Sequence, residues 1–215
     1  MTFSELPARR GAGGGVPAPA TRPAGPAGGT TVRAALDDRA ARLVAAAREL
    51  ANETGSAAFT VAQVARRAGL SLKSFYRCFR GKDDLLLALL RDDSGLGAQI
   101  LRDRAARSDD PLAAVVDALF EMATDPASTG YAGILVREHR RLSEIDPIGL
   151  DHALAPLTDV LAELIGTEDA RRDAHTMLGV LVAGIHDVLS GRVTDAPGHA
   201  RYLHRFCTRG LTGGS

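Results

Sequence analysis

The sequence predicts an all-α fold, in which a three-helix unit precedes a helical bundle. Ala and Leu, both strong helix formers, supply most of the apolar residues, while aromatic residues make up only 4% of the chain and Trp is absent. A β-sandwich would use more Val, Ile, Tyr and Thr. From Thr31 onward apolar residues recur at helical spacing, and no segment alternates between apolar and polar residues as a half-buried strand would.

Three helical patterns follow one another closely in the first part of the chain. The first has a single apolar stripe and ends at Gly55. A short helix capped by Thr60 follows, and a turn ending in the capping residue Ser71 leads into a third helix from Leu72 to Phe79. This order is typical of a helix-turn-helix unit. The stripes consist of Leu36, Ala40, Leu43, Val44, Ala47, Leu50 and Ala51 in the first helix and Val61, Val64, Ala65 and Ala68 in the second.

The third helix has two chemically different faces. Phe75 and Phe79 lie on one face, which must be buried against the two preceding helices, so that the opposite face is left for the major groove of DNA. That polar face carries Lys73, Ser74 and Arg77, whose side chains can donate hydrogen bonds to base edges. Leu72 falls on the apolar side of the helix. It either packs inward, which we expect, or contacts a thymine methyl group.

Three further residues are suited to phosphate contacts. Tyr76 lies at the border of the two faces, where its hydroxyl can reach a phosphate. Thr60 and Lys82 each stand at the start of a helix, where free backbone N–H groups and the helix dipole favour an anionic oxygen.

The stretch FTVAQVARRAGLSLKSFYRCFRGKDDLLLALL, residues 59–90, resembles the DNA-binding signature of the TetR family of transcriptional regulators. With the helix ahead of it, the likeness covers roughly residues 33–90. The resemblance implies phosphate contacts by Thr60, Tyr76 and Lys82, and base reading by Arg77 and the first turn of the third helix. Two positions depart from the family pattern, because the position of Lys73 is commonly small and that of Leu72 is frequently polar. The matching features are Phe59, Thr60, Val61, Val64, Ala65, Ala68, Gly69, Leu70, Ser71, Phe75, Tyr76, Phe79 and Lys82 with the acidic residues and leucines after it.

Charge is unevenly distributed along a chain whose formal net charge is zero. Residues 1–92 contain 14 Lys and Arg against 8 Asp and Glu, a net charge of +6, and residues 93–215 contain 12 against 18, a net charge of −6. The basic first part is therefore the part expected to meet a polyanion. We divide the chain into a Gly/Ala/Pro-rich tail (1–30), a helix-turn-helix domain (31–92) and a C-terminal domain (93–215). The tail is expected to be disordered. Its three arginines could form a basic arm that contacts DNA, but we favour the interpretation that it is a solubilising tail.

Breaker residues divide the C-terminal part into helix-sized segments. They stand at Gly95, 109–111, 125–126, 146–147, 166–167 and Gly191. Asp110 and Thr167 are expected to cap helices, and Pro156 is expected to kink or break the helix that contains it.

The segment from Thr167 to Leu189 is apolar on nearly all sides after its charged first turns, so it should be buried on more than one side. In TetR-like proteins the last two long helices form the dimer interface, and we assign that role to this segment together with residues 197–211. The expected interface residues are His175, Leu178, Leu181, Gly184, Ile185 and Val188.

Other patterns favour no catalytic or metal site. His175 and His186 share a helix face but lack the further ligands of a metal site, and Cys78 and Cys207 lack metal-site spacing. The charged run from Arg137 to Arg141 could anchor an acidic ligand, although a solvated helix face is the more ordinary explanation. We therefore expect neither enzyme activity, nor a cofactor, nor a bound metal.

The sequence thus predicts a cytoplasmic, homodimeric regulator with no membrane association. We expect it to bind a palindromic double-stranded operator. Because most proteins of this type are repressors, we expect a repressor that an unknown small molecule releases from DNA. The alternative is a helix-turn-helix protein whose C-terminal domain only dimerises and binds no ligand. An all-helical enzyme is a second, disfavoured alternative.

Overall fold

A computed structural model describes residues 28–125 and 129–212, and within these ranges the chain forms α-helices and no strands. All but the last three residues of the predicted tail lie outside the described part, and those three begin the first helix. The helices are α1 (Gly28–Thr54), α2 (Val61–Arg67), α3 (Leu72–Cys78), α4 (Lys82–Ala105), α5 (Pro111–Thr124), α6 (Thr129–Ile145), α7 (Pro147–Ile165), α8 (Ala170–Leu189) and α9 (Ala196–Thr212).

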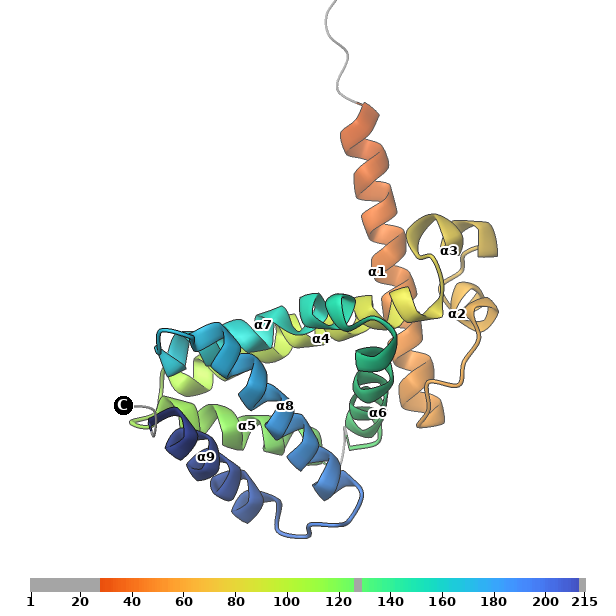
Figure 1. Cartoon of the computed structure of the whole chain (residues 1–215). Helices are drawn as coiled ribbons and strands as arrows, with labels where there is room; N and C mark the ends of the chain where they lie inside the picture. The colour runs from red at the N-terminus through yellow and green to blue at the C-terminus, as the bar shows by residue number, and fades with distance from the viewer. Residues whose placement is uncertain (1–27, 126–128, 213–215) are drawn as a thin grey trace, which may run out of the picture.

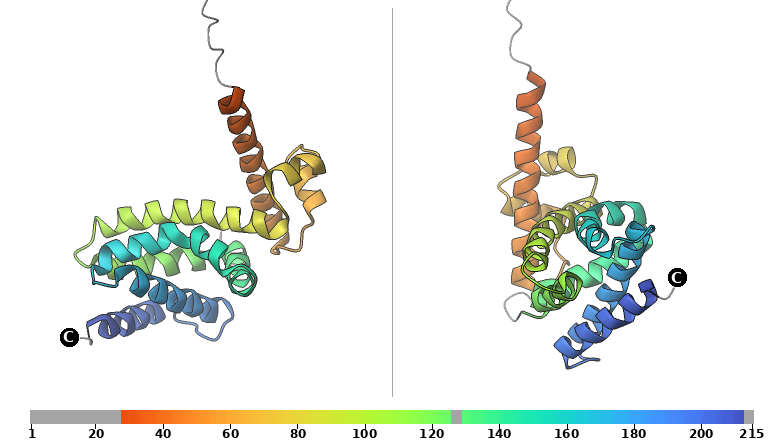
Figure 2. Two further views of the ribbon diagram at one scale, coloured as in Figure 1. Left: turned by 45° about the horizontal axis from the view of Figure 1, so that its top comes forward. Right: turned by 90° about the vertical axis from the view of Figure 1, so that its left-hand side faces the viewer.

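The helices form two groups joined by one long helix. Helices α1, α2 and α3 lie together at one end of the molecule, with the first half of α1 projecting beyond the bundle (Figure 1). Helix α4 runs from this unit into the bundle, where it packs along α7 and against α5 (Figure 2). Helices α8 and α9 cover the side of the bundle away from α4. None of the helices in the described ranges is both long and apolar enough to span a lipid bilayer.

Local sequence signals set the ends of the first three helices, as expected. Thr60 and Gln63 form a reciprocal capping box at the start of α2, and the Ser71 hydroxyl accepts a hydrogen bond from the amide of Ser74 at the start of α3. Between these helices Gly69 adopts a left-handed conformation (φ 66°). The amide of Gly69 donates to the carbonyl of Arg66 (3.1 Å) and that of Leu70 to the carbonyl of Ala65 (2.8 Å). This pattern is a Schellman motif, which ends α2 and turns the chain toward α3.

Five of the six expected breaks in the C-terminal part separate helices in the structure, whereas the break at Gly95 and the cap at Thr167 are wrong. Asp110 caps α5, and Gly191 adopts a left-handed conformation after α8. Gly95 does not break the chain, because α4 is one helix of 24 residues that passes through it. Buried residues on both sides of Gly95 hold the helix together, and a glycine inside a helix costs only about 1 kcal/mol. Thr167 is not a cap either: α8 begins three residues later, and the Thr167 hydroxyl donates to the carboxylate of Asp173 (2.6 Å).

Helix α7 continues through Pro156, so the proline does not break it. The helix is capped by Asp146, whose carboxylate accepts the amide hydrogen bond of Gly149 (2.9 Å), and it ends at Gly166 in a left-handed conformation. Pro147 occupies the first turn, where a missing N–H group costs nothing.

Two apolar cores follow the two groups of helices. The first core is formed by α1 to the first turns of α4, but α6 contributes Ile134 and Leu142 to it and α7 contributes Leu150 and Ala153. The second core fills the bundle between the rest of α4 and helices α5 to α9. The helix-turn-helix unit is therefore completed by side chains that lie in the bundle.

Four of the six residues predicted for a dimer interface are buried inside the single chain instead. Leu178, Leu181, Gly184 and Ile185 of α8 belong to the core of the bundle, and Leu181 has no exposed surface. A Cβ atom at Gly184 would collide with Leu203 of α9, so the close helix approach that this glycine permits occurs within the chain. These four residues cannot contact a second chain unless the bundle opens. The two remaining residues are His175, which is exposed, and Val188, which is half-buried against the bundle core.

Candidate nucleic-acid interface and bundle cavity

Helix α3 presents the polar face that the sequence predicts. Phe75 is fully buried and Phe79 nearly so, which fixes the rotation of α3 against α1 and α2. Lys73 and Arg77 are exposed on the opposite side. Tyr76 is 59% exposed and packs edge-to-face on Phe75, with 5.4 Å between the ring centroids, so its hydroxyl end is left in solvent.

The hydroxyl groups near α3 are partly used inside the protein. The side chains of Ser71 and Ser74 hydrogen-bond to each other (3.1 Å). The Thr60 hydroxyl accepts the amide of Gln63 (3.2 Å) as part of the capping box, although Thr60 itself is exposed. Thr60 is exposed and Ser74 is half-exposed, so each can contact DNA while the caps formed by Thr60 and Ser71 stay in place.

Leu72 does not pack inward, contrary to expectation. Its side chain is 48% exposed, whereas Phe75, one turn later on the same side, has no exposed surface. Leu72 is the first residue of α3 and lies beside the turn, so it is not covered as Phe75 is. Of the two interpretations drawn from the sequence, inward packing is therefore excluded, and Leu72 faces outward.

The ammonium group of Lys82 is engaged within the protein. It donates a short hydrogen bond to the carbonyl of Ala57 and lies 5.0 Å from the centroid of the Phe59 ring, in a cation–π contact. Both partners belong to the segment between α1 and α2. Lys82 therefore connects the first turn of α4 to the loop that precedes α2, and in this conformation its side chain is not extended toward solvent.

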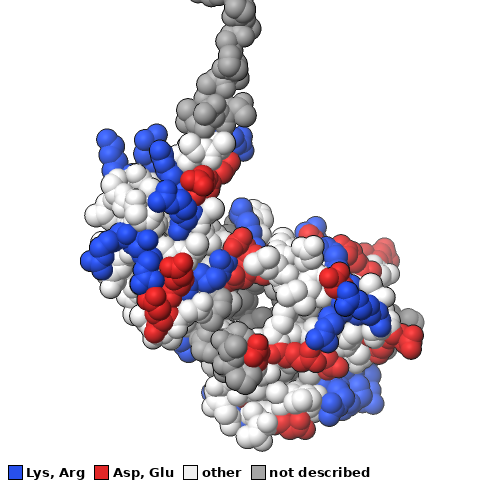
Figure 3. All heavy atoms as spheres, turned by 180° about the vertical axis from the view of Figure 1, so that it is seen from behind, with Lys and Arg blue, Asp and Glu red and all other residues white. Residues whose placement is uncertain are grey.

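Basic side chains gather around the three-helix unit. Lys and Arg project from the α1–α3 end of the molecule on the face shown in Figure 3. Arg67 of α2 is paired with Glu53 (2.7 Å) and Glu49 (3.3 Å) of α1, which fixes α2 against α1. The hydrogen bond from Arg67 also holds the pKa of the Glu53 carboxyl below its usual value. Lys73 and Arg77, by contrast, are the basic residues that α3 itself displays.

A cavity of about 320 Å³ lies in the bundle between α4, α5, α6, α7 and α8. Of the described residues that line it, all but Asp93, Ser94 and His139 are apolar. Ser94 is nearly fully buried, and Asp93 has 19% of its side chain exposed. Such a concave apolar space with a few polar groups is typical of small-molecule sites. The apolar residues that line it include Leu119, Met122, Ala132, Leu135, Leu154, Leu157, Leu178 and Leu181.

The charged run on α6 divides between the cavity and the helix-turn-helix unit. His139 lines the cavity, and burial together with the nearby charge of His175 lowers the pKa of its imidazole. Arg141 pairs with Asp83 of α4 (2.6 Å) and with Glu138 (2.7 Å), and Arg137 donates to the carbonyl of Gly55 (3.3 Å). Arg141 therefore joins α6 to the first turn of α4, and Arg137 joins it to the segment that follows α1.

Asp93 is a cavity residue that the sequence interpretation missed. It follows Leu86 and Leu90 at intervals of seven and three residues, so it falls on the buried side of α4. The sequence did contain a signal for it, namely an acidic residue at a position where the helical spacing predicts a core residue. Its partner Arg48 is 45 residues earlier in the sequence, and no local pattern connects the two.

Within residues 28–125 and 129–212 no group of three or more His, Cys, Asp or Glu residues is placed to hold a metal ion. His175 lies 3.7 Å from Asp151, and His186 is at a different place on α8, beside Gly55 and Arg137. The two histidines thus face different surroundings although they share one side of the helix.

Comparison with known proteins identifies the family. Residues 43–89 match the family model described as bacterial regulatory proteins, tetR family. An uncharacterized HTH-type transcriptional regulator of Haemophilus influenzae is 31% identical over 140 residues, which are 62% of this chain and 67% of that protein.

Solved structures of TetR-like proteins share the fold. A TetR transcriptional regulator from Rhodococcus sp. RHA1 superimposes with a TM-score of 0.66 at 20% identity, over 82% of this chain and 97% of that chain. The regulator FadR from Bacillus subtilis, solved in complex with stearoyl-CoA, superimposes with a TM-score of 0.60 at 17% identity. The match covers 81% of this chain and 98% of the FadR chain. The matched segment contains α2, α3 and the start of α4, with the exposed polar face of α3 at its centre. The chain belongs to the TetR family of DNA-binding transcriptional regulators, a family of regulators rather than enzymes.

Proposed function

We propose that this protein binds a palindromic operator as a homodimer and that a small molecule in the bundle releases it from DNA. The observation that carries the proposal is the outer face of α3, where Lys73 and Arg77 are exposed while Phe75 and Phe79 fix the helix from behind. A helix presented in this way fits the major groove of B-DNA.

The residues around α3 divide into two roles. Lys73 and Arg77 donate to guanine O6 and N7, and Ser74 contacts a neighbouring base edge. Leu72, which faces outward, is placed to contact a thymine methyl group. Thr60 and Tyr76 contact phosphates on either side and set the register of α3 on the duplex.

Lys82 acts mainly by positioning in this proposal. Its hydrogen bond to Ala57 and its contact with the ring of Phe59 hold the segment that leads into α2, and Thr60 stands at the end of that segment. A direct phosphate contact, which the family resemblance implies, would require the ammonium group to leave both partners.

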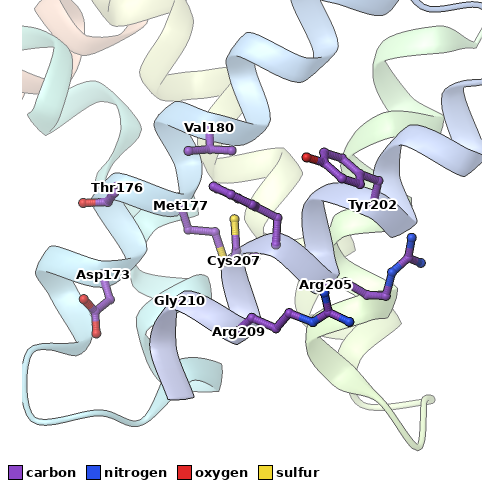
Figure 4. Close-up of a pocket in the computed structure, with 10 residues that line it drawn as sticks. Asp173, Thr176, Met177, Val180, Tyr202, Arg205, Cys207, Arg209 and Gly210 are labelled. Atoms are coloured by element: carbon purple, nitrogen blue, oxygen red, sulfur yellow. The ribbon is translucent and has the colours of Figure 1, made fainter. Parts of the chain in front are cut away.

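We place the dimer interface on the outer face of α8 and α9. A groove of about 850 Å³ runs between these helices, with Thr176 and Val180 on the α8 side and Tyr202 on the α9 side (Figure 4). Tyr202 and Phe206 are 53% and 58% exposed, and their rings stack with 6.4 Å between centroids. Large exposed aromatic residues that lie side by side are characteristic of interfaces. The helices are those predicted from the sequence, but the side of α8 that carries Thr176 and Val180 is a different one from the side that carries Leu181 and Ile185.

A second copy of the chain supplies what operator recognition needs. One α3 contacts only one half-site, and two half-sites about 34–36 Å apart are read by two copies related by a two-fold axis. Joining α8 and α9 of one chain to those of another would leave both α3 helices free, because α3 lies at the opposite end of the molecule (Figure 1).

The cavity in the bundle supports the ligand-responsive part of the proposal. Its apolar wall is formed by five helices, including α4 and α6, which both also contact the three-helix unit. A molecule that binds one arrangement of these helices better than another shifts the separation of the two α3 helices. The related FadR was solved with stearoyl-CoA bound, so a similar fold accommodates a small molecule. In the alternative, the bundle serves only for dimerisation and the cavity stays empty.

The test is selection of genomic DNA fragments by the purified protein, followed by footprinting of the retained sequences. We expect an inverted repeat whose half-sites are separated by one helical turn, bound by a species that sediments as a dimer. Retention of fragments with no shared sequence, or binding by the monomer to a single half-site, would contradict the proposal.

A further inference from the structure

The cavity in the bundle is apolar except at one edge, where it meets a charged group. Among the described lining residues Asp93 alone carries a formal charge at neutral pH, and Ser94 beside it is nearly fully buried. The third polar residue, His139, belongs to α6 and lies on the boundary between this cavity and a smaller one that also includes His175 and Asp151.

Asp93 is held by an arginine from the three-helix unit. Arg48 of α1 donates to Oδ1 of Asp93 from Nη2 (2.7 Å) and from Nε (3.2 Å). The same Nη2 also donates to Oδ2 of Asp92 (2.5 Å). Asp92 has 54% of its side chain exposed and does not line the cavity, whereas Asp93 has 19% exposed and does. One guanidinium is thus shared by two carboxylates, and the three groups together carry one net negative charge.

The charges around the cavity discriminate between ligand types. An anionic group placed there would lose its hydration and meet a carboxylate, and none of the described lining residues is a lysine or an arginine. His139 does not supply the missing positive charge, because burial and the neighbouring His175 lower the pKa of its imidazole. A cationic group finds a carboxylate that is partly removed from water, where the attraction between opposite charges is strengthened.

We propose that the cavity takes an apolar molecule bearing one cationic nitrogen, whose charge pairs with Asp93 in competition with Arg48. The apolar body occupies the space between Leu119, Leu154 and Leu157, and an N–H group is placed to reach Asp93 and Ser94. This inference rests on the proposed function for the use of the cavity and adds the class of ligand. It also states what the ligand displaces, namely an ion pair between α1 and α4. Arg48 then keeps its bond to Asp92, on the solvent side of α4.

Three probes with one apolar body and different charges test the ligand class. We would titrate the full-length protein at pH 7 with 1-naphthylmethylamine, which is cationic, 1-naphthylmethanol, which is neutral, and 1-naphthoate, which is anionic, using isothermal titration calorimetry. We expect the amine to bind at least about tenfold more tightly than the alcohol, since a charge-assisted hydrogen bond contributes more than a neutral one. We expect 1-naphthoate to bind more weakly than the alcohol.

Two isosteric variants show whether Asp93 is responsible. Asp93→Asn should remove the preference for the amine over the alcohol, while its binding of the alcohol persists. Asp92→Asn is the matched control, because Asp92 contacts the same guanidinium but lies outside the cavity. It should keep the preference. The melting temperature of each variant, measured without probe, shows whether it is folded.

Several results would overturn the inference. These are binding of 1-naphthoate as tightly as the amine, an unchanged amine preference in Asp93→Asn, or binding of none of the three probes. The comparison of the three probes on the unmodified protein decides the ligand class even if Asp93→Asn does not fold. No DNA is present, so failure of this inference is separate from failure of the proposed function. A protein that selects the amine but retains no operator would contradict only the latter.

Discussion

Gly184 of α8 lies directly against the side chain of Leu203 of α9, so closely that any side chain at position 184 would meet it. Phe120 of α5 and His199 of α9 approach the same point, each 3.2 Å from where a Cβ would stand. The small residue thus closes the bundle of one chain. A substitution at Gly184 would disturb folding, so its effect on dimerisation could not be separated from that. The interface therefore has to be tested by substitutions on the outer face of α8 and α9.

Phe206→Glu should yield a folded monomer. The side chain of Phe206 is 58% exposed in the single chain, so a carboxylate there costs the fold little, but it would be buried without a partner twice in a two-fold dimer. Analytical ultracentrifugation gives the oligomeric state and far-ultraviolet circular dichroism gives the fold. Leu181→Ala is the contrasting variant: it should lower the free energy of unfolding by about 2–5 kcal/mol and remain a dimer. A dimeric Phe206→Glu protein would exclude the proposed face.

Lys73→Ala and Arg77→Ala should each weaken specific operator binding by about 1–3 kcal/mol, because both side chains are exposed on the outer face of α3. Their melting temperatures should match that of the unmodified protein. Affinities would be measured at one salt concentration for the operator and for an unrelated duplex. Arg107→Ala, an exposed arginine beyond the far end of α4, is the control and should bind normally. Unchanged operator affinity in both α3 variants would show that α3 does not read the bases.

Tyr76→Phe should weaken binding to all sequences by a similar factor. The substitution removes only the hydroxyl and keeps the edge-to-face contact with Phe75, so the fold of α3 is preserved. A phosphate contact carries no sequence information, and its loss therefore affects operator and unrelated DNA alike. A loss confined to the operator would show that the hydroxyl reads a base instead.

Lys82→Ala should lower the melting temperature while leaving the salt dependence of DNA binding nearly unchanged. The variant loses the hydrogen bond to Ala57 and the cation–π contact with Phe59, which together contribute on the order of 1–2 kcal/mol. The measurement is the slope of the logarithm of the binding constant against that of the salt concentration. A slope smaller by about one unit would instead show that Lys82 turns to a phosphate in the complex.

The protein should lose stability as the pH falls below about 6.5, and His139 should account for part of the loss. Its imidazole pKa is lowered in the folded state from the ordinary value of 6.5, so the unfolded chain binds more protons in this range. The stabilisation is present above pH 6.5 and declines as the pH falls toward the folded pKa. The melting temperature should therefore change less between pH 7.5 and pH 5.5 in His139→Gln than in the unmodified protein. Replacement of the exposed His152 by Gln is the control, and an equal effect from it would refute the assignment to His139.

The parts of the fold that depend on neighbouring residues could be predicted from the sequence. Thr60, Ser71 and Asp110 cap their helices because a short polar side chain reaches an amide only two or three residues away. The exposed polar face of α3 could be predicted in the same way, since Phe75 and Phe79 determine which side is buried. Leu72 has the spacing of a core residue, yet it remains exposed because no described helix packs over the first residue of α3.

The parts that depend on distant contacts could not be predicted. A helix that is apolar all round needs partners on several sides, but its sequence does not say whether they come from the same chain. For α8 they come from α5, α6, α7 and α9 of the same chain, and Leu178, Leu181 and Ile185 are buried among them. The bond between Arg48 and Asp93 joins residues 45 positions apart, and neither lies in a recognisable motif.

Helix α4 has a consequence for how the molecule unfolds. Its first turns belong to the core of the three-helix unit and its later turns to the core of the bundle, with no interruption between them. A fragment ending at residue 92 would lose not only half of this helix but also Ile134, Leu142, Leu150 and Ala153 from its own interior. The DNA-binding unit is therefore not a detachable module, and heat or denaturant should melt it together with the bundle in one cooperative transition.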